Sequence, residues 1–207
     1  DGKLYVQLSS EIPGASIYYT LDGSEPGIGN IKYEQPVQIQ ASTILKAVTV
    51  VNDKVMGMKA AEQSFVMHKA LGKNVVYATP VSRYYMADGP NSLTDGVRGT
   101  FAVGKYWHGF SGNDLVATID LGEETLVQKI TLGCLQNYRD WIFLPQSVTY
   151  EISIDGKNFI NVGTVNNNIS PDEKNPVIKN FTANFSAQHA RYIRVTAKNL
   201  GECPKGH

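Results

Sequence analysis

Two short stretches of this sequence place aromatic rings beside polar side chains. The first, KYWHGFSG, begins at Lys105, and the second, QNYRDW, begins at Gln136. An aromatic ring can lie flat against the C–H face of a sugar ring, while amide, imidazole and guanidinium groups beside it hydrogen-bond the sugar hydroxyls. We therefore expect a saccharide to be bound by side chains of these two loops: Tyr106, Trp107, His108, Phe110, Asn137, Tyr138, Arg139 and Trp141.

Each of these residues also has a structural interpretation. Trp107 and Trp141 could close the ends of a β-sandwich, and His108 could hydrogen-bond Asp114 to hold its own loop. Other members have similar alternatives: Arg139 and Asp140 as solvated surface, Phe143 as core, and Tyr84 and Tyr85 as either a further wall of the site or packing. The grouping of aromatic and polar residues in two loops favours binding for the set as a whole.

A third polar stretch, SLTDGVRGT from Ser92, has the composition of a tight loop that could bind a hard cation. Calcium prefers about six to eight oxygen ligands, and such a loop can present backbone carbonyls beside a carboxylate and a hydroxyl. Asp95-Gly96 could equally be a turn whose carboxylate bonds its own backbone. The sequence leaves both interpretations open.

No residue pattern predicts catalysis within the chain. Glu123 and Glu124 are adjacent carboxylates, but neighbours on a turn point apart, whereas glycoside hydrolysis needs two carboxyl groups flanking one bond. The sequence has no nucleophile elbow, no paired-histidine zinc motif and no phosphate-binding loop. We therefore expect a non-enzymatic fragment.

Composition excludes several partners. Lys plus Arg and Asp plus Glu both number 19, so the formal net charge is zero and no basic surface for nucleic acid or anionic membrane is expected. No apolar run approaches the roughly 18 residues that span a bilayer, and the start, DGKLYVQL, does not read as a signal peptide. Cys134 and Cys203 are compatible with a disulfide or with free thiols, and we favour free thiols.

The elements that position these loops read as strands throughout. In residues 1–68, Leu4, Val6 and Leu8 alternate with polar residues, and Asp22-Gly23 and Asn52-Asp53 are turn pairs. A short junction, 69–73, leads to residues 74–207, where about eight short strands are expected. Three alternating sets should face the core there: Ala117, Ile119 and Leu121; Val148, Tyr150 and Ile152; Ile193, Val195 and Ala197. The predicted class is all-β, an immunoglobulin-like β-sandwich followed by a jelly-roll β-sandwich.

Residues 74–207 also resemble a known family. LTDG followed by a Trp-containing loop and an IDLG strand, then LPQSVTYEISIDGKNFINV and ARYIRVTAKN, are similar to coagulation factor 5/8 type C (discoidin-like) domains, which share their fold with family 32 carbohydrate-binding modules. The resemblance implies a discoidin-like jelly roll with a shallow sugar site among loops at one end. It also implies a structural Ca²⁺ with ligands from Asp95, Thr100, Leu93 and Arg98. In that family a glutamate near the C-terminal end often completes this shell. This chain stops before such a residue, so we expect a C-terminally truncated domain.

Residues 1–68 resemble a second family. IYYTLDGSEP and YEQPVQIQASTILKAVTV are similar to the chitobiase/β-hexosaminidase C-terminal domain of bacterial family 20 glycoside hydrolases. This resemblance implies a spacer that follows a catalytic barrel of the same chain, in a secreted, periplasmic or outer-surface β-N-acetylhexosaminidase. The second domain would then hold the enzyme near glycans carrying galactose- or N-acetylhexosamine-type sugars. Two alternatives stay open: structural bracing of the barrel, or adhesion to phospholipid or protein. Replacing Trp107 or Trp141 by Ala should abolish glycan binding without unfolding the domain.

Overall fold

The computed structural model describes residues 3–206, and its regular structure is almost entirely β-strand. Within these residues the one helical segment is a short 3-10 turn, η1 (Tyr138–Asp140). The chain divides into two compact units. The first contains residues up to Gly72 together with Asp95–Arg98, and the second contains Lys73–Thr94 together with the residues from Gly99 onward. The predicted all-β class is confirmed.

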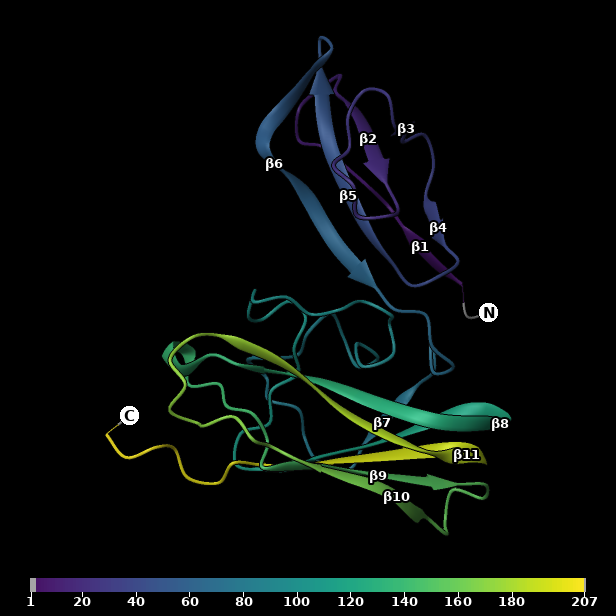
Figure 1. Ribbon diagram of the computed structural model, residues 1–207, viewed down its shortest axis with the longest axis vertical. Coiled ribbons are helices and arrows are strands. Elements are labelled where there is room, and N and C mark those ends of the chain that lie inside the picture. The colour runs from purple at the N-terminus through teal and green to yellow at the C-terminus, as the bar shows by residue number, and fades with distance from the viewer. Residues whose placement is uncertain (1–2, 207) are drawn as a thin grey trace. The chain divides into compact units, whose positions relative to one another are not determined.

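The first unit consists of two antiparallel sheets (Figure 1). One sheet pairs β1 (Leu4–Val6) with β4 (Val37–Ile39). The other has the order β3-β2-β5-β6, with these bounds: β3 (Ile31–Lys32), β2 (Ser16–Thr20), β5 (Thr43–Val51) and β6 (Lys54–Phe65). The core between the sheets is small, and its buried members are Val37, Ile39, Leu45, Ala47 and Phe65.

The alternation predicted from the sequence explains which side chains enter this core. Val37 and Ile39 are buried, and Gln38 between them points to the other face of β4. The β5–β6 hairpin turns at Asn52 and Asp53, whose φ angles of 48° and 57° are the positive values that a tight hairpin requires.

Asp95–Arg98 packs with the first unit although it lies far along the chain. The backbone N–H of Val66 donates to the carbonyl of Gly96 (2.8 Å), and the backbone N–H of Arg98 donates to the carbonyl of Ser64 (3.0 Å). Gly96 has φ of 80°, and a Cβ there would lie 2.7 Å from Cδ1 of Leu71. Only glycine therefore fits at this position, so close packing against Leu71 is the reason that a glycine follows Asp95.

The second unit contains a five-stranded antiparallel sheet of order β10-β9-β11-β8-β7 (Figure 1). Its strands have these bounds: β7 (Val75–Tyr77), β8 (Leu115–Gln136), β9 (Ser147–Ser153), β10 (Ile160–Asn166) and β11 (Val177–Lys198). All three sets of alternating residues predicted to face the core are buried. The alternation therefore assigned the inner faces of β8, β9 and β11 correctly.

The two longest strands differ from the prediction. About eight short strands were expected in this unit, but residues 127–135 and 177–185 are each part of a 22-residue strand, β8 or β11. Their pairing shifts register near Gly122, whose φ is 88°, and between Asn184 and Gln188. Extra residues at such bulges let paired strands bend without ending, so the turn signals in the sequence mark bends.

Beyond these bends, β8 and β11 form the second layer of the sandwich. The hydroxyl of Tyr150 on β9 donates to the carbonyl of Phe181 (2.6 Å) and accepts the N–H of Leu132 (3.0 Å). Tyr150 and Phe181 are both fully buried. Burial raises the pKa of Tyr150, so its proton stays in place to hold the two layers together.

Candidate functional site

Both aromatic loops enter the five-stranded sheet at the same end. Ala197 pairs with Leu115 on one side and with Val148 on the other. The loop that carries Trp107 ends at Leu115, and the loop that carries Trp141 ends just before Val148. The topology therefore places the bases of the two loops on β8 and β9, the two strands that flank β11.

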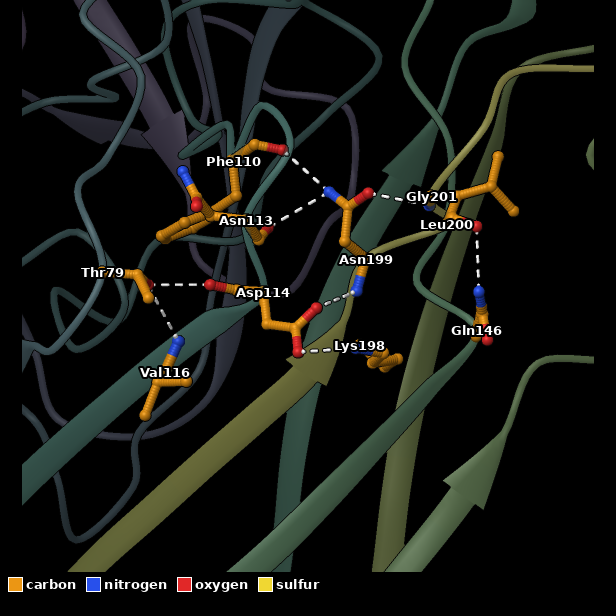
Figure 2. Close-up of polar contacts among 10 residues, drawn as sticks. All are labelled: Thr79, Phe110, Asn113, Asp114, Val116, Gln146, Lys198, Asn199, Leu200 and Gly201. Atoms are coloured by element: carbon orange, nitrogen blue, oxygen red, sulfur yellow. Dashed lines mark hydrogen bonds and ion pairs between the residues drawn. The ribbon is translucent and has the colours of Figure 1, made fainter.

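Lys198 and Asn199 connect these two bases (Figure 2). The Asp114 carboxylate accepts hydrogen bonds from Nζ of Lys198 (3.1 Å) and the backbone N–H of Asn199 (2.8 Å). The backbone N–H of Gln146 donates to the carbonyl of Lys198 (2.8 Å). The Asn199 N–H and Lys198 lower the pKa of Asp114, so the carboxylate is ionised at neutral pH.

Asn199 also holds the C-terminal part of the first loop. Its Nδ2 donates to the carbonyls of Phe110 and Asn113, both at 3.1 Å, and its Oδ1 accepts the N–H of Gly201 (2.8 Å) (Figure 2). These bonds fix the backbone on the C-terminal side of the aromatic residues. Asn199 was not predicted as a site residue, because a lone Asn after a strand gives no local signal of what it will contact.

Trp107 is packed into its own unit. Its Nε1–H donates to the carbonyl of Thr100 (2.8 Å), and the ring is half-buried. A Cβ added at Gly99 would lie 2.4 Å from Cζ2 of the indole, so the ring lies directly against this backbone. Trp107 thus uses its polar atom and one ring face within the protein.

His108 has partners on both sides of its ring. Nδ1 lies 2.8 Å from the hydroxyl of Tyr77, and Nε2 lies 3.0 Å from the carbonyls of Met86 and Gly89. Because carbonyls only accept, Nε2 carries a proton in this arrangement. The alternative that His108 holds its loop is consistent with these bonds, although its partners are Tyr77, Met86 and Gly89, and Asp114 contacts Lys198 and Asn199. The ring of Tyr77 also contacts Phe110, with centroids 6.2 Å apart, and burial raises the pKa of Tyr77.

The segment around Tyr84 runs beside the first loop. The backbone N–H of Ser82 donates to the carbonyl of Gly109 (2.8 Å), and the backbone N–H of Gly109 donates to the carbonyl of Tyr85 (3.0 Å). Tyr85 packs so closely that a Cβ at Gly109 would lie 2.9 Å from it. Tyr84 is 72% exposed, and Nη2 of Arg83 donates to its hydroxyl (2.6 Å). Of the two tyrosines, only Tyr84 therefore faces solvent.

Tyr106 completes the first loop. Its side chain is half-buried, and Nζ of Lys105 lies 5.3 Å from its ring centroid. The neighbouring Phe110 is half-buried as well. In this loop the aromatic side chains of Tyr106, Trp107 and Phe110 are therefore all partly covered.

The second loop has a different construction. Asn137 and Ile142 exchange two backbone hydrogen bonds of 2.9 and 3.1 Å across η1, and Nδ2 of Asn137 donates to Asp140 (2.6 Å). Trp141 closes the turn with φ of 60° and ψ of 34°, and its side chain is 61% exposed. A bulky side chain in the left-handed region is unusual, so this turn presents the indole to solvent at a conformational cost.

Polar groups lie around the base of this turn. Nζ of Lys174 lies 3.1 Å from the ring centroid of Tyr138, whose edge-to-face partner is Phe143 at 6.1 Å. Arg139 is exposed. Among residues 3–206, Oδ1 of Asn137 is the one buried side-chain oxygen or nitrogen without a hydrogen-bond partner.

The residues expected to bind calcium belong to different units. Asp95 and Arg98 lie in the first unit, and Leu93 and Thr100 lie in the second. Oδ1 of Asp95 accepts the N–H of Val97 (2.7 Å), and the carbonyl of Arg98 accepts Nε2 of Gln63 (2.8 Å). The Asp95 bond is the one expected of an Asx turn. Calcium binding stays a prediction.

Three further properties concern the whole described chain. Residues 3–206 contain no cluster of three or more His, Cys, Asp or Glu side chains suited to a metal ion. None of the helical structure in this range is long and apolar enough to cross a membrane. Cys134 and Cys203 are free thiols, as favoured from the sequence.

Comparison with known proteins assigns the family. Residues 77–204 match the F5/8 type C domain model. The chain belongs to the F5/8 type C family. Residues 6–58 match a second model, described as Fn3 associated. No curated protein is similar enough in sequence to count as a relative.

Several solved structures are similar to the F5/8 type C domain. Chitosan-binding module 1 of a chitosanase/glucanase from Paenibacillus sp. IK-5 is 18% identical, with a TM-score of 0.44, over 63% of this chain and 85% of that one. CpGH89CBM32-5 from Clostridium perfringens, in complex with GalNAc-β-1,3-galactose, is 17% identical, with a TM-score of 0.41, over 62% and 86%. Chitosan-binding module 2 of the Paenibacillus enzyme, in complex with chitotriose, is 16% identical, with a TM-score of 0.43, over 64% and 88%.

Proposed function

We propose that the F5/8 type C domain binds saccharides and that Trp141 is the aromatic surface on which a sugar ring lies. The observation that carries this proposal is an indole 61% exposed at φ of 60°. A left-handed conformation costs an L-residue on the order of 1–2 kcal/mol. Strain of this kind concentrates at ligand-binding sites, where the constraint has a functional use.

Polar groups beside Trp141 suit sugar hydroxyls. Arg139 offers exposed guanidinium donors, and Asp140 offers carboxylate oxygens. Asn137 holds these groups in place, because its Nδ2 donates to Asp140 (2.6 Å) and its backbone closes the turn with Ile142.

The first loop lies at the same end of the sheet and leads into β8. Trp107 and His108 use their polar atoms inside the protein, so we assign them to holding the loop in place. Tyr84 and Tyr106 stay candidates for further contact with the glycan. A site open to solvent that covers about one sugar should bind with a Kd on the order of 1 mM, or about 4 kcal/mol.

The sugar class and the wider role follow from the two family resemblances. We propose galactose- or N-acetylhexosamine-type ligands, and a targeting role in a secreted, periplasmic or outer-surface β-N-acetylhexosaminidase of bacterial origin. Tethering to a catalytic domain would make weak binding effective, because the linked domain raises the local concentration of substrate. The support for this parent enzyme is the YTLDGSEP segment of the first unit.

The experiment is a glycan array followed by affinity electrophoresis in gels that contain the best glycan. We expect the unaltered chain to be retarded and Trp141→Ala to be retarded clearly less. Ile160→Ala is the matched control, because Ile160 is 63% exposed and lies toward the other end of β9 and β10. Equal retardation of Trp141→Ala and the unaltered chain would overturn the proposal.

Calcium binding is tested by thermal unfolding of the same chain. If Asp95 and Thr100 contribute to a structural site, added CaCl₂ should raise the melting temperature relative to EDTA, and Asp95→Asn should remove the difference. Identical melting curves in CaCl₂ and EDTA would count against the ion.

A further inference from the structure

The first unit has a hollow on its surface that the sequence did not predict. It has a volume of ≈ 730 Å³, and its lining includes Tyr5, Tyr19, Gln35, Gln38 and Gln40. The hollow is open to solvent, so it suits a ligand that lies on the surface. The sequence interpretation of this unit as a spacer gives such a hollow no role.

Strand pairing explains how the hollow acquires its side chains. Tyr5 on β1 is directly opposite Gln38 on β4. Alternation turns Val37 and Ile39 into the core, so Gln38 and Gln40 share the opposite face with Tyr5. Tyr5 is 54% exposed. One aromatic ring therefore stands in the open with amide side chains on its own face of the sheet.

The polar atoms of this surface are available to a ligand. Within residues 3–206, the side-chain amides of Gln35, Gln38 and Gln40 make no hydrogen bond to the protein, and neither do the hydroxyls of Tyr5 and Tyr19. Each amide can donate and accept at once, as can each hydroxyl. Such groups match the mixed donors and acceptors of sugar hydroxyls and acetamido groups.

A second hollow extends this surface. It has a volume of ≈ 560 Å³, and it shares Tyr19 and Leu21 with the first hollow. Asp22 and Asn30 line it further along. The hydroxyl and N–H of Ser24 lower the pKa of Asp22, so its carboxylate is ionised at neutral pH. The shared residues place the two hollows next to each other, and together they are called the groove below.

We infer that this groove is a second glycan-binding site, which takes a neutral chain of pyranose sugars with one ring lying on Tyr5. An acidic glycan is disfavoured because Asp22 is the charged group in the lining. Within the lining, Tyr5, Gln38 and Gln40 share the outer face of β1 and β4, where a ring and amide groups match the C–H face and the hydroxyls of a sugar. The site lies outside the F5/8 type C domain, so it does not depend on Trp141.

The test uses the full chain and NMR titration with N,N′,N″-triacetylchitotriose and, separately, galactose. In Trp141→Ala we expect at least one sugar to shift the backbone amides of β1 and β4 and the side-chain amides of Gln38 and Gln40. Adding Tyr5→Ala or Gln38→Ala should remove these shifts. Gln128→Ala is the control, because Gln128 is exposed on β8.

The outcomes separate this inference from the proposed function. If Trp141→Ala alone abolishes all sugar-induced shifts, the second site is overturned and the site at Trp141 stands. If shifts persist in Trp141→Ala and are lost only with Tyr5→Ala, the second site is supported. The inference also fails if neither sugar shifts β1 and β4 at several times the expected Kd of about 1 mM, or if a neutral Thr/Ser-rich peptide shifts them and the sugars do not.

Discussion

The two aromatic loops of the F5/8 type C domain look alike in the sequence and differ in the structure. In the first, the indole N–H of Trp107 bonds Thr100 and both nitrogens of His108 have partners. In the second, Trp141 closes a turn and is 61% exposed. Both loops are anchored at the same end of one sheet, so the difference arises from the segments that lie beside each loop.

Neighbouring segments explain the contrast. The first loop is covered by two other parts of the chain, one around Gly99 and one from Ser82 to Gly89. The second loop closes mainly on itself, through the hydrogen bonds between Asn137 and Ile142. An aromatic side chain contributes to packing where other chain segments cover it. It is available to a ligand where its loop is closed by hydrogen bonds of its own backbone.

The largest expected effect is on stability in the first loop. Trp107→Ala should lower the free energy of unfolding by about 2–4 kcal/mol, because it removes a half-buried ring and leaves the Thr100 carbonyl unpaired. Trp141→Ala should change it by less than about 0.5 kcal/mol. Urea unfolding measures both, and equal losses would contradict the contrast between the loops. The sequence alone had predicted that both variants stay folded and lose binding.

The next effect concerns the base of the first loop. Asn199→Ala should cost about 1–2 kcal/mol, because the carbonyls of Phe110 and Asn113 and the N–H of Gly201 lose their partner. Asn184→Ala is the control and should be close to neutral, because Asn184 is an exposed asparagine on β11, the strand that Asn199 follows. Thermal unfolding of both variants gives the answer. If they melt together, Asn199 does not hold the loop.

A third prediction addresses the strained turn. Trp141→Gly should be about 1 kcal/mol more stable than Trp141→Ala, because glycine adopts φ of 60° without steric cost. Both variants should lose binding at the Trp141 turn and therefore show equally reduced retardation by the glycan. Chemical denaturation and affinity electrophoresis measure the two effects separately. Equal stability of the glycine and alanine variants would show that the left-handed turn carries no strain.

The smallest effect is the response to acid at the base of the first loop. The pKa of Asp114 is lowered in the folded state, so its contribution to stability is present above its ordinary pKa of about 4. That contribution is lost as the pH falls through the lowered value. The melting temperature should therefore decrease from pH 5 toward pH 3, and less steeply in Asp114→Asn. An unchanged pH slope in that variant would remove Asp114 as the cause.

Much of the fold was predictable because strand patterning is local. Tyr150 and Val148 were expected on one inner face, and both are buried. The bends of β8 and β11 were not predictable, because Gly122 gives the same signal whether a strand ends or bends there. The partners of His108 could not be identified for a related reason. Its partners Tyr77, Met86 and Gly89 lie 19 to 31 residues away, and only folding brings them near.

The sequence by itself determined the all-β class, the inward-facing residues and the two aromatic loops, because the alternation of apolar and polar residues and the turn pairs act over a few positions. The tertiary structure decided which tryptophan is covered, that Gly96 packs beside Leu71 in the first unit, and that Tyr5 stands among free glutamine amides. These outcomes depend on contacts between residues distant in the chain, and burial and hydrogen bonding assign each side chain its role only when those contacts form.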